Sequence, residues 1–169
     1  YYTAGTKRDS ISVTQADFDK DIAGTWFITS SNSEKAYRVT IGRKGNKYAM
    51  VLAGLNWTIP LSYNKTTNAL SIAAGDSIGM YKDYHIGTVF YDMEAGYITW
   101  SKSVTLSGTF GHNDAEGYSF LEFKDNGSWE GYKPNSLLLS AFTSSSFTNK
   151  TYKNDLLELD DPTLIRLDK

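Results

Sequence analysis

The chain of 169 residues contains no cysteine, which excludes disulfide bonds, thiolate metal sites and cysteine nucleophiles. Proline is scarce as well, with three residues, so the composition does not indicate a disordered or low-complexity chain. No stretch approaches the roughly 18 apolar residues that a membrane-spanning helix requires. The sequence therefore describes a folded domain whose stability comes from packing rather than from covalent cross-links.

A large excess of one charge is also missing. There are 17 basic and 19 acidic residues, which gives a formal net charge of −2. Lys and Arg form no conspicuous cluster, and this argues against nucleic-acid binding by phosphate neutralisation and against docking to an acidic membrane surface. We expect no nucleic-acid partner and a monomeric protein.

Aromatic residues are abundant, at 14% of the chain with 12 Tyr and 4 Trp, and they suit half-buried pleated surfaces. From Thr25 to Leu167 short runs with strand character are separated by Gly, Asn and Asp turns. Such regular, short spacing favours an antiparallel β-barrel or sandwich. Because closure removes exposed sheet edges, we expect an all-β antiparallel barrel of about eight to ten strands.

Several local features carry specific expectations. Residues 47–53 are apolar on both faces, as in a strand that is covered on both sides. Residues 75–83 are expected to form a loop. Asp125-Asn126-Gly127 is the strongest hairpin signal and should pair residues 118–124 with residues 128–132.

The first 21 residues differ from the rest and are interpreted as an N-terminal extension or linker, followed by one barrel domain over residues 22–169. Within the extension, residues 15–20 could form one helical turn that is capped by Thr14.

The segment Gly24-Thr25-Trp26 resembles the Gly-x-Trp opening of lipocalins and their calycin relatives. Residues 63–72 are similar to the segment of tyrosine, polar turn, leucine and β-run found in lipocalin-like domains of surface lipoproteins of gut anaerobic bacteria. The resemblance implies that Gly24 and Trp26 close one end of the barrel, with Arg166 stacked on the indole. It also implies a secreted or cell-surface domain of the bacterial envelope, held to the membrane only by a lipid anchor outside this sequence.

Four aromatic residues on different expected strands are candidates for ligand binding, because aromatic faces bind sugars and apolar molecules without charge: Trp57, Tyr63, Trp100 and Trp129. The alternative is that the tryptophans belong to the core. Inward-facing apolar residues could fill the barrel completely, and the candidates for this are Met50, Leu52, Leu61 and Ile86.

No catalytic or metal-binding pattern stands out. His85 and His112 are distant in sequence, and no cysteine accompanies them, so no metal site is expected. The acidic residues do not form a recognisable pair, and a Gly-x-Ser-x-Gly elbow is missing from the sequence. We therefore expect neither enzymatic activity nor a cofactor.

The function predicted from the sequence is non-catalytic binding of a small apolar molecule or glycan in or at the barrel mouth, opposite the end sealed by Trp26. The alternative is a protein-interaction or carbohydrate-binding scaffold domain with a filled barrel, and a hydrolase is the third reading.

Overall fold

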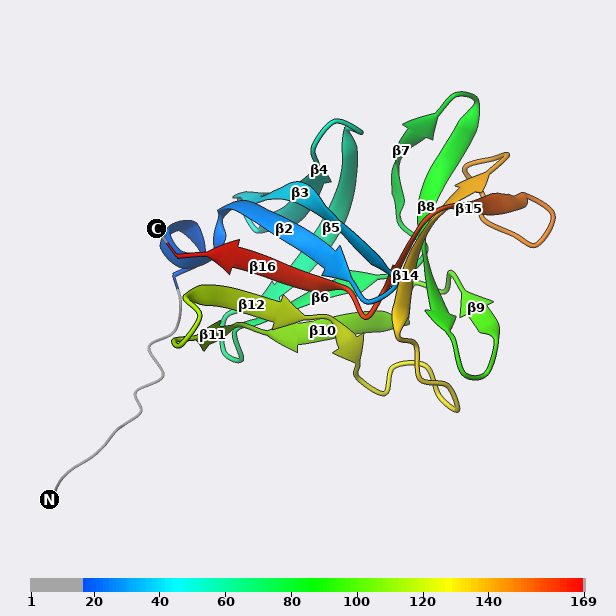
Figure 1. Ribbon diagram of the computed structural model, residues 1–169. Coiled ribbons are helices and arrows are strands. Elements are labelled where there is room, and N and C mark those ends of the chain that lie inside the picture. The colour runs from blue at the N-terminus through cyan, green and yellow to red at the C-terminus, as the bar shows by residue number, and fades with distance from the viewer. Residues whose placement is uncertain (1–16, 169) are drawn as a thin grey trace, which may run out of the picture.

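The computed structural model describes residues 17–168 and shows an all-β protein with two sheets (Figure 1). The larger sheet has ten strands, in the order β11-β12-β16-β2-β3-β4-β5-β6-β10-β13. Their bounds are, in that order, β11 (Gly111–Asn113), β12 (Tyr118–Glu122), β16 (Thr163–Leu167), β2 (Gly24–Ser30), β3 (Ser33–Lys44), β4 (Lys47–Leu52), β5 (Trp57–Asn64), β6 (Ala69–Ala73), β10 (Thr105–Thr109) and β13 (Lys124–Asp125).

The smaller sheet has the order β15 (Tyr152–Asp160), β14 (Ser136–Phe142), β8 (Tyr84–Asp92) and β7 (Ser77–Tyr81), and β9 (Tyr97–Thr99) pairs with β8. The pairings of both sheets are antiparallel. The predicted all-β antiparallel class is therefore confirmed.

The larger sheet curls into an antiparallel half-barrel (Figure 1). Residues alternate along its strands, so that Trp26 and Ile28 of β2 and Val39 and Ile41 of β3 are buried while their neighbours face outward. Strands β10 and β12 approach each other at Gly108, where a β-carbon would overlap the carbonyl oxygen of Glu122. Glycine is required here because two backbones meet at this point.

Apolar side chains fill the inside of the half-barrel. The residues that the sequence placed there, Met50, Leu52, Leu61 and Ile86, are 0, 2, 7 and 0% exposed and belong to one continuous core cluster. Ile86 comes from the smaller sheet, so both sheets share this core.

The smaller sheet lies at the end of the half-barrel opposite the start of β2 (Figure 1). The β2–β3 turn is joined to β15 by the amide of Ser31, which donates to the carbonyl of Asp160 at 2.9 Å. The indole N–H of Trp57, at the start of β5, donates to the carbonyl of Met80 in β7 at 3.2 Å. The end at which the sequence predicted an open mouth is thus where the second sheet packs.

The predicted hairpin at Asp125-Asn126-Gly127 is wrong. Gly127 does adopt a turn conformation (φ 81°), but residues 128–132 form no strand. Instead β13 pairs with β10, and the Asn126 amide donates to the hydroxyls of Thr105 and Ser107. The predicted turn at Gly127 is therefore present. The strand that precedes it, β13, pairs with β10, which lies earlier in the chain, and not with residues 128–132.

Two further expectations need correction. The expected loop 75–83 contains strand β7, because Lys82 (φ 55°) allows a tight turn that returns the chain onto β8. The helical turn is a π-helical turn, η1 (Phe18–Ile22), with Asp17 as its N-cap. Thr14 and residues 1–16 lie outside the described residues, and the domain boundary at residue 21 stays a prediction.

The close approach at Gly108 gives a test of closure. Gly108→Ala should lower the free energy of unfolding by about 1–3 kcal/mol, because the added methyl overpacks the contact with Glu122. Gly42→Ala is the matched control, since no atom lies within 4 Å of its β-carbon position. Urea unfolding of both variants measures the difference, and equal midpoints would contradict the described closure.

Candidate functional site

Trp26 is held in place at the η1 end of the half-barrel. Its ring is 1% exposed, and its indole N–H donates to the carbonyl of Ile22 at 2.6 Å. The guanidinium of Arg166 lies 4.3 Å from the ring centroid, within cation–π range. At Gly24 (φ 120°) a β-carbon would lie 3.0 Å from an Arg166 nitrogen, so the small residue leaves room for the stacked cation.

Arg166 also fixes the chain that precedes β2. It donates to four carbonyl oxygens at 2.8 to 3.2 Å, those of Asp21, Ile22, Ala23 and Thr25. One side chain therefore holds both η1 and the first residues of the strand against the indole.

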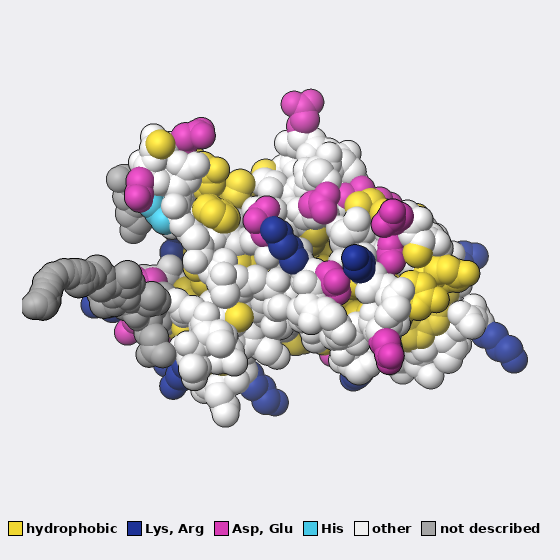
Figure 2. Space-filling model, turned by 90° about the horizontal axis from the view of Figure 1, so that it is seen from below, with side chains coloured by type: hydrophobic (Ala, Val, Ile, Leu, Met, Phe, Trp, Pro, Cys, Tyr) yellow, Lys and Arg dark blue, Asp and Glu magenta, His cyan; other side chains and the backbone are white. Residues whose placement is uncertain are grey.

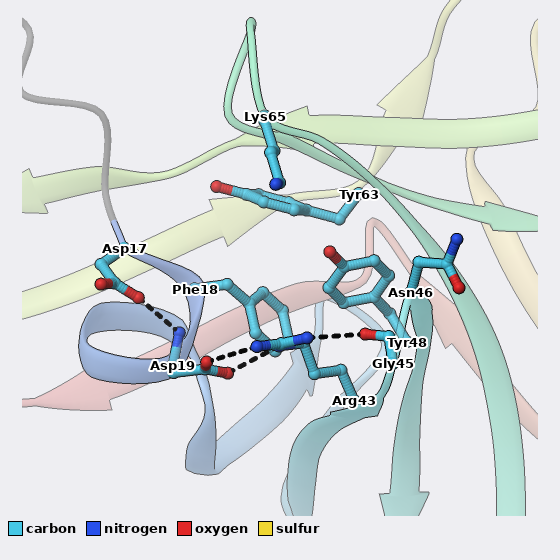
Figure 3. A pocket seen from close by; sticks show the side chains of 9 residues that line it. All are labelled: Asp17, Phe18, Asp19, Arg43, Gly45, Asn46, Tyr48, Tyr63 and Lys65. Atoms are coloured by element: carbon cyan, nitrogen blue, oxygen red, sulfur yellow. Dashed lines mark hydrogen bonds and ion pairs between the residues drawn. The ribbon is translucent and has the colours of Figure 1, made fainter.

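A groove of about 610 Å³ opens beside η1, between that turn and the β3–β4 and β5–β6 hairpins (Figure 3). This size falls within the usual range of ligand sites, about 300–1,000 Å³. Its lining combines aromatic, charged and amide side chains: Asp17, Phe18, Asp19, Arg43, Gly45, Asn46, Tyr48, Tyr63 and Lys65.

Three aromatic rings form one wall of this groove. Phe18 is 6% exposed, with its ring centroid 4.6 Å from that of Tyr48 and 5.3 Å from that of Tyr63. The two tyrosine rings are 5.4 Å apart and half-buried. The hydroxyl of Tyr63 donates to the side-chain oxygen of Asn68 at 2.6 Å, and burial raises the pKa of this tyrosine. Phe18 thus supports two rings that each keep part of their surface in solvent.

An ion pair also lines the groove, beside Phe18 and Tyr48 (Figure 3). Arg43 donates to both carboxylate oxygens of Asp19, at 2.8 and 2.7 Å, and to the carbonyl of Gly45 at 2.7 Å. The hydrogen bond from Arg43 holds the pKa of Asp19 below its usual value, and Asp19 in turn raises the pKa of Arg43. The pair ties η1 to the β3–β4 hairpin and keeps both groups ionised.

The four predicted ligand-binding aromatics do not come together. Trp57 is 4% exposed and is part of the core, as the alternative reading had it. Trp100 packs in a second small core, where its ring lies 5.5 Å from that of Phe142. Trp129 is half-buried and stacks on Tyr132 at 4.5 Å. Only Tyr63 lines the groove.

Sequence reasoning missed Phe18, Tyr48 and the Arg43–Asp19 pair. Phe18 was placed in the extension, and Tyr48 was not singled out within its strand. A signal was present in the alternation of β4, because Tyr48 has the same parity as the inward-facing Met50 and Leu52. An aromatic residue at the inward position nearest the end of a strand, as Tyr48 is in β4, is a candidate for the rim.

His112 joins the β11–β12 hairpin to the end of the chain. Its Nδ1 lies 2.5 Å from Asp114 and its Nε2 lies 3.0 Å from both carboxylate oxygens of Asp168. Hydrogen bonds to Asp168 and then to Asp114 raise the pKa of His112. Among residues 17–168 no group of three or more His, Asp or Glu side chains is arranged to hold a metal ion.

Comparisons with protein-family models, curated proteins and solved structures found no match to this chain. Over the described part of the chain, no helix is long and apolar enough to cross a membrane.

Arg166 is predicted to be a main support of the η1 end. Arg166→Met should lower the free energy of unfolding by about 2–3 kcal/mol, because several backbone carbonyls lose a charged donor. Arg38→Met, an exposed site on β3, should change it by less than about 0.5 kcal/mol. Chemical denaturation measures both, and an Arg166 effect as small as the control would contradict this role.

His112 predicts a pH-dependent contribution to stability. Because its folded pKa is raised above 6.5, the contribution is fully present below that pH and is lost as pH rises through the folded pKa. The urea midpoint of the wild-type protein should therefore fall as pH rises above 6.5, and His112→Gln and Asp168→Asn should both flatten this fall. Parallel profiles for wild type and variants would show that the cluster does not contribute.

Proposed function

We propose that this protein is a non-catalytic carbohydrate-binding domain on a lipocalin-like barrel, with its ligand in the groove beside η1. The observation that carries the proposal is the juxtaposition of two half-buried tyrosine rings, a buried supporting phenylalanine and polar side chains around about 610 Å³ of space.

The barrel part of the proposal is supported by strand order. Strands β2 to β6 follow one another in the sheet, then come β10 and, on the other side of β2, β16 and β12. The approach of β10 to β12 at Gly108 would bring eight of these strands nearly full circle. The contact of Arg166 with Trp26 is the arrangement that the lipocalin resemblance implies.

The groove is favoured over the barrel interior because the interior is occupied. The inward side chains of both sheets form one buried cluster, and the second sheet packs over the end opposite Trp26. When the interior of a barrel is filled by side chains, a ligand can bind only at its surface. The filled interior therefore favours the alternative predicted from the sequence, a scaffold domain that binds carbohydrate or protein at its surface.

A saccharide fits the chemistry of the groove. Tyrosine rings offer apolar faces with a polar edge, which suits a ligand that has C–H faces and hydroxyl groups. The charges of Asp19 and Arg43 are matched within the wall, so the ligand does not have to supply a counter-charge. Asn46 and Arg43, both exposed, provide donors at the rim.

The hydrogen bonds of the two carboxylates in the groove, Asp17 and Asp19, favour binding of a carbohydrate over its hydrolysis. Both oxygens of Asp19 accept from Arg43, and its lowered pKa makes it a poor proton donor. Asp17 caps η1 by accepting from the amide of Asp19 at 3.0 Å. Each carboxylate thus has a structural partner.

We also propose a location in the bacterial cell envelope, with membrane attachment through a lipid anchor outside the described domain. The support for this part is the lipocalin resemblance of Gly24-Thr25-Trp26 and residues 63–72.

A second candidate function, a protein-interaction scaffold, is favoured by an aromatic stack near β9. Trp129 and Tyr132 stack at 4.5 Å, and Tyr97, 58% exposed, meets Tyr132 edge-on at 5.4 Å. Figure 2 shows one group of hydrophobic side chains toward the end that carries β9, with acidic and basic side chains beside it, and a second hydrophobic group toward the opposite end of that face. Exposed patches of this kind often mark contact surfaces.

The test is titration with four hexasaccharides, of β-1,4-glucan, β-1,4-xylan, β-1,4-mannan and α-1,4-glucan, followed by calorimetry and amide NMR. We expect one of them to bind and to shift the amides of the β3–β4 and β5–β6 hairpins. Tyr63→Ala should weaken binding at least about tenfold, which is about 1.4 kcal/mol, since it removes a ring from the groove.

Tyr97→Ala is the matched control, because it removes an equally large ring from the other aromatic cluster. Loss of binding in this variant alone would place the ligand at the second candidate surface. If none of the four saccharides shifts the groove amides, the carbohydrate proposal is wrong.

A further inference from the structure

The outer face of β3, β4 and β5 carries a row of short side chains. Gly42 of β3 pairs with Ala49 of β4, and Ala49 pairs with Pro60 of β5. These residues alternate with the inward-facing core residues, so they lie on the solvent side of the sheet. The sequence predicted that both faces of residues 47–53 would be covered, and this is wrong for the outer face, where Val51 is 36% exposed.

This row forms the floor of a second groove, of about 410 Å³. No atom lies within 4 Å of the β-carbon position of Gly42, so the floor is open to solvent there. The neighbouring row, Thr40, Val51 and Thr58, continues the groove along the strands. These two rows therefore form a strip of small and β-branched residues that is concave rather than protruding.

The charges at this groove have one sign. Arg43, Lys44 and Lys47 are among its lining residues, and the lining contains no Asp or Glu. Lys44 and Lys47 occupy directly opposite positions where the β3–β4 hairpin closes. Like charges at opposed positions are destabilising, and within residues 17–168 neither lysine has an acidic partner. An anion at this end would relieve the repulsion.

An apolar strip that ends in paired cations is complementary to a molecule with an apolar chain and an anionic head. We propose that the outer groove of β3–β4–β5 binds one long-chain fatty acid, with the acyl chain over Gly42, Ala49 and Pro60 and the carboxylate at Lys44 and Lys47. A single chain fits better than a bilayer surface, because membrane contact needs protruding apolar side chains and this strip is recessed.

This site is independent of the carbohydrate groove, although the two adjoin. Tyr48 and Arg43 line both, because they are paired next to the closed end of the β3–β4 hairpin, where the end of the half-barrel meets its outer face. Gly42, Lys44 and Lys47 line only the outer groove, so variants at these positions test it alone.

The probe is sodium laurate below its critical micelle concentration, with methyl NMR of Ala49 and Val51 as the readout. Laurate should shift the methyl signals of both residues, and dodecyltrimethylammonium, with an alkyl chain of nearly the same length and the opposite charge, should bind at least about tenfold more weakly. Gly42→Leu should block the floor, and Lys44→Glu with Lys47→Glu should repel the carboxylate, each weakening laurate at least about tenfold.

Lys150→Glu with Lys153→Glu, at two exposed positions at and just before the start of β15, is the matched charge control and should leave laurate binding unchanged. Unchanged urea midpoints show that the variants are folded, and the hexasaccharide titration shows separately whether the first groove functions. The inference is overturned if laurate leaves the methyl signals of both residues in place or if both amphiphiles bind equally. It is also overturned if the protein sediments with phosphatidylglycerol vesicles but does not bind monomeric laurate.

Discussion

The structure depends on the contact between the guanidinium of Arg166 and the indole of Trp26. The cation lies over the ring and donates to the carbonyls that lead from η1 into β2. The carbonyls of Asp21, Ile22 and Ala23 lie at the end of a short turn that could not satisfy them by itself, so Arg166, from a strand far along the chain, provides the donors. The first and last strands of the half-barrel are thereby joined, and Phe18 is delivered to the place where it supports Tyr48 and Tyr63.

The second major constraint is the packing of the smaller sheet over the far end. Its strands come from two insertions in the order of the large sheet, one between β6 and β10 and one between β13 and β16. They contribute Phe90, Leu137 and Leu139 to the same core as the half-barrel. The smaller sheet fills the interior from the far end, and Trp26 closes the η1 end, so little space is left inside for a ligand. Binding sites are therefore expected on the outer surface and at the η1 end.

Part of this arrangement was predictable. Period-two alternation gave the strand character of β3, and Trp26 and Arg166 were singled out as a pair that the structure places in contact. The second sheet was not predictable in this way, because Leu137, Leu138 and Leu139 form an apolar run without alternation, and all of β14 is buried. The groove was missed because Phe18, Arg43 and Tyr63 meet only after two hairpins and η1 have folded.

The β3–β4 hairpin shows how one element can serve two surfaces. Tyr48 and Ala49 are neighbours in the chain, and strand geometry sends their side chains to opposite faces of the sheet. The inward tyrosine reaches the rim of the half-barrel, while the outward alanine belongs to the row that ends at Lys44 and Lys47. Arg43 lies between the two grooves, where it donates hydrogen bonds to the carboxylate of Asp19 and to the carbonyl of Gly45. Because that anchor ties the hairpin to η1, the same few hydrogen bonds position the lining of both grooves.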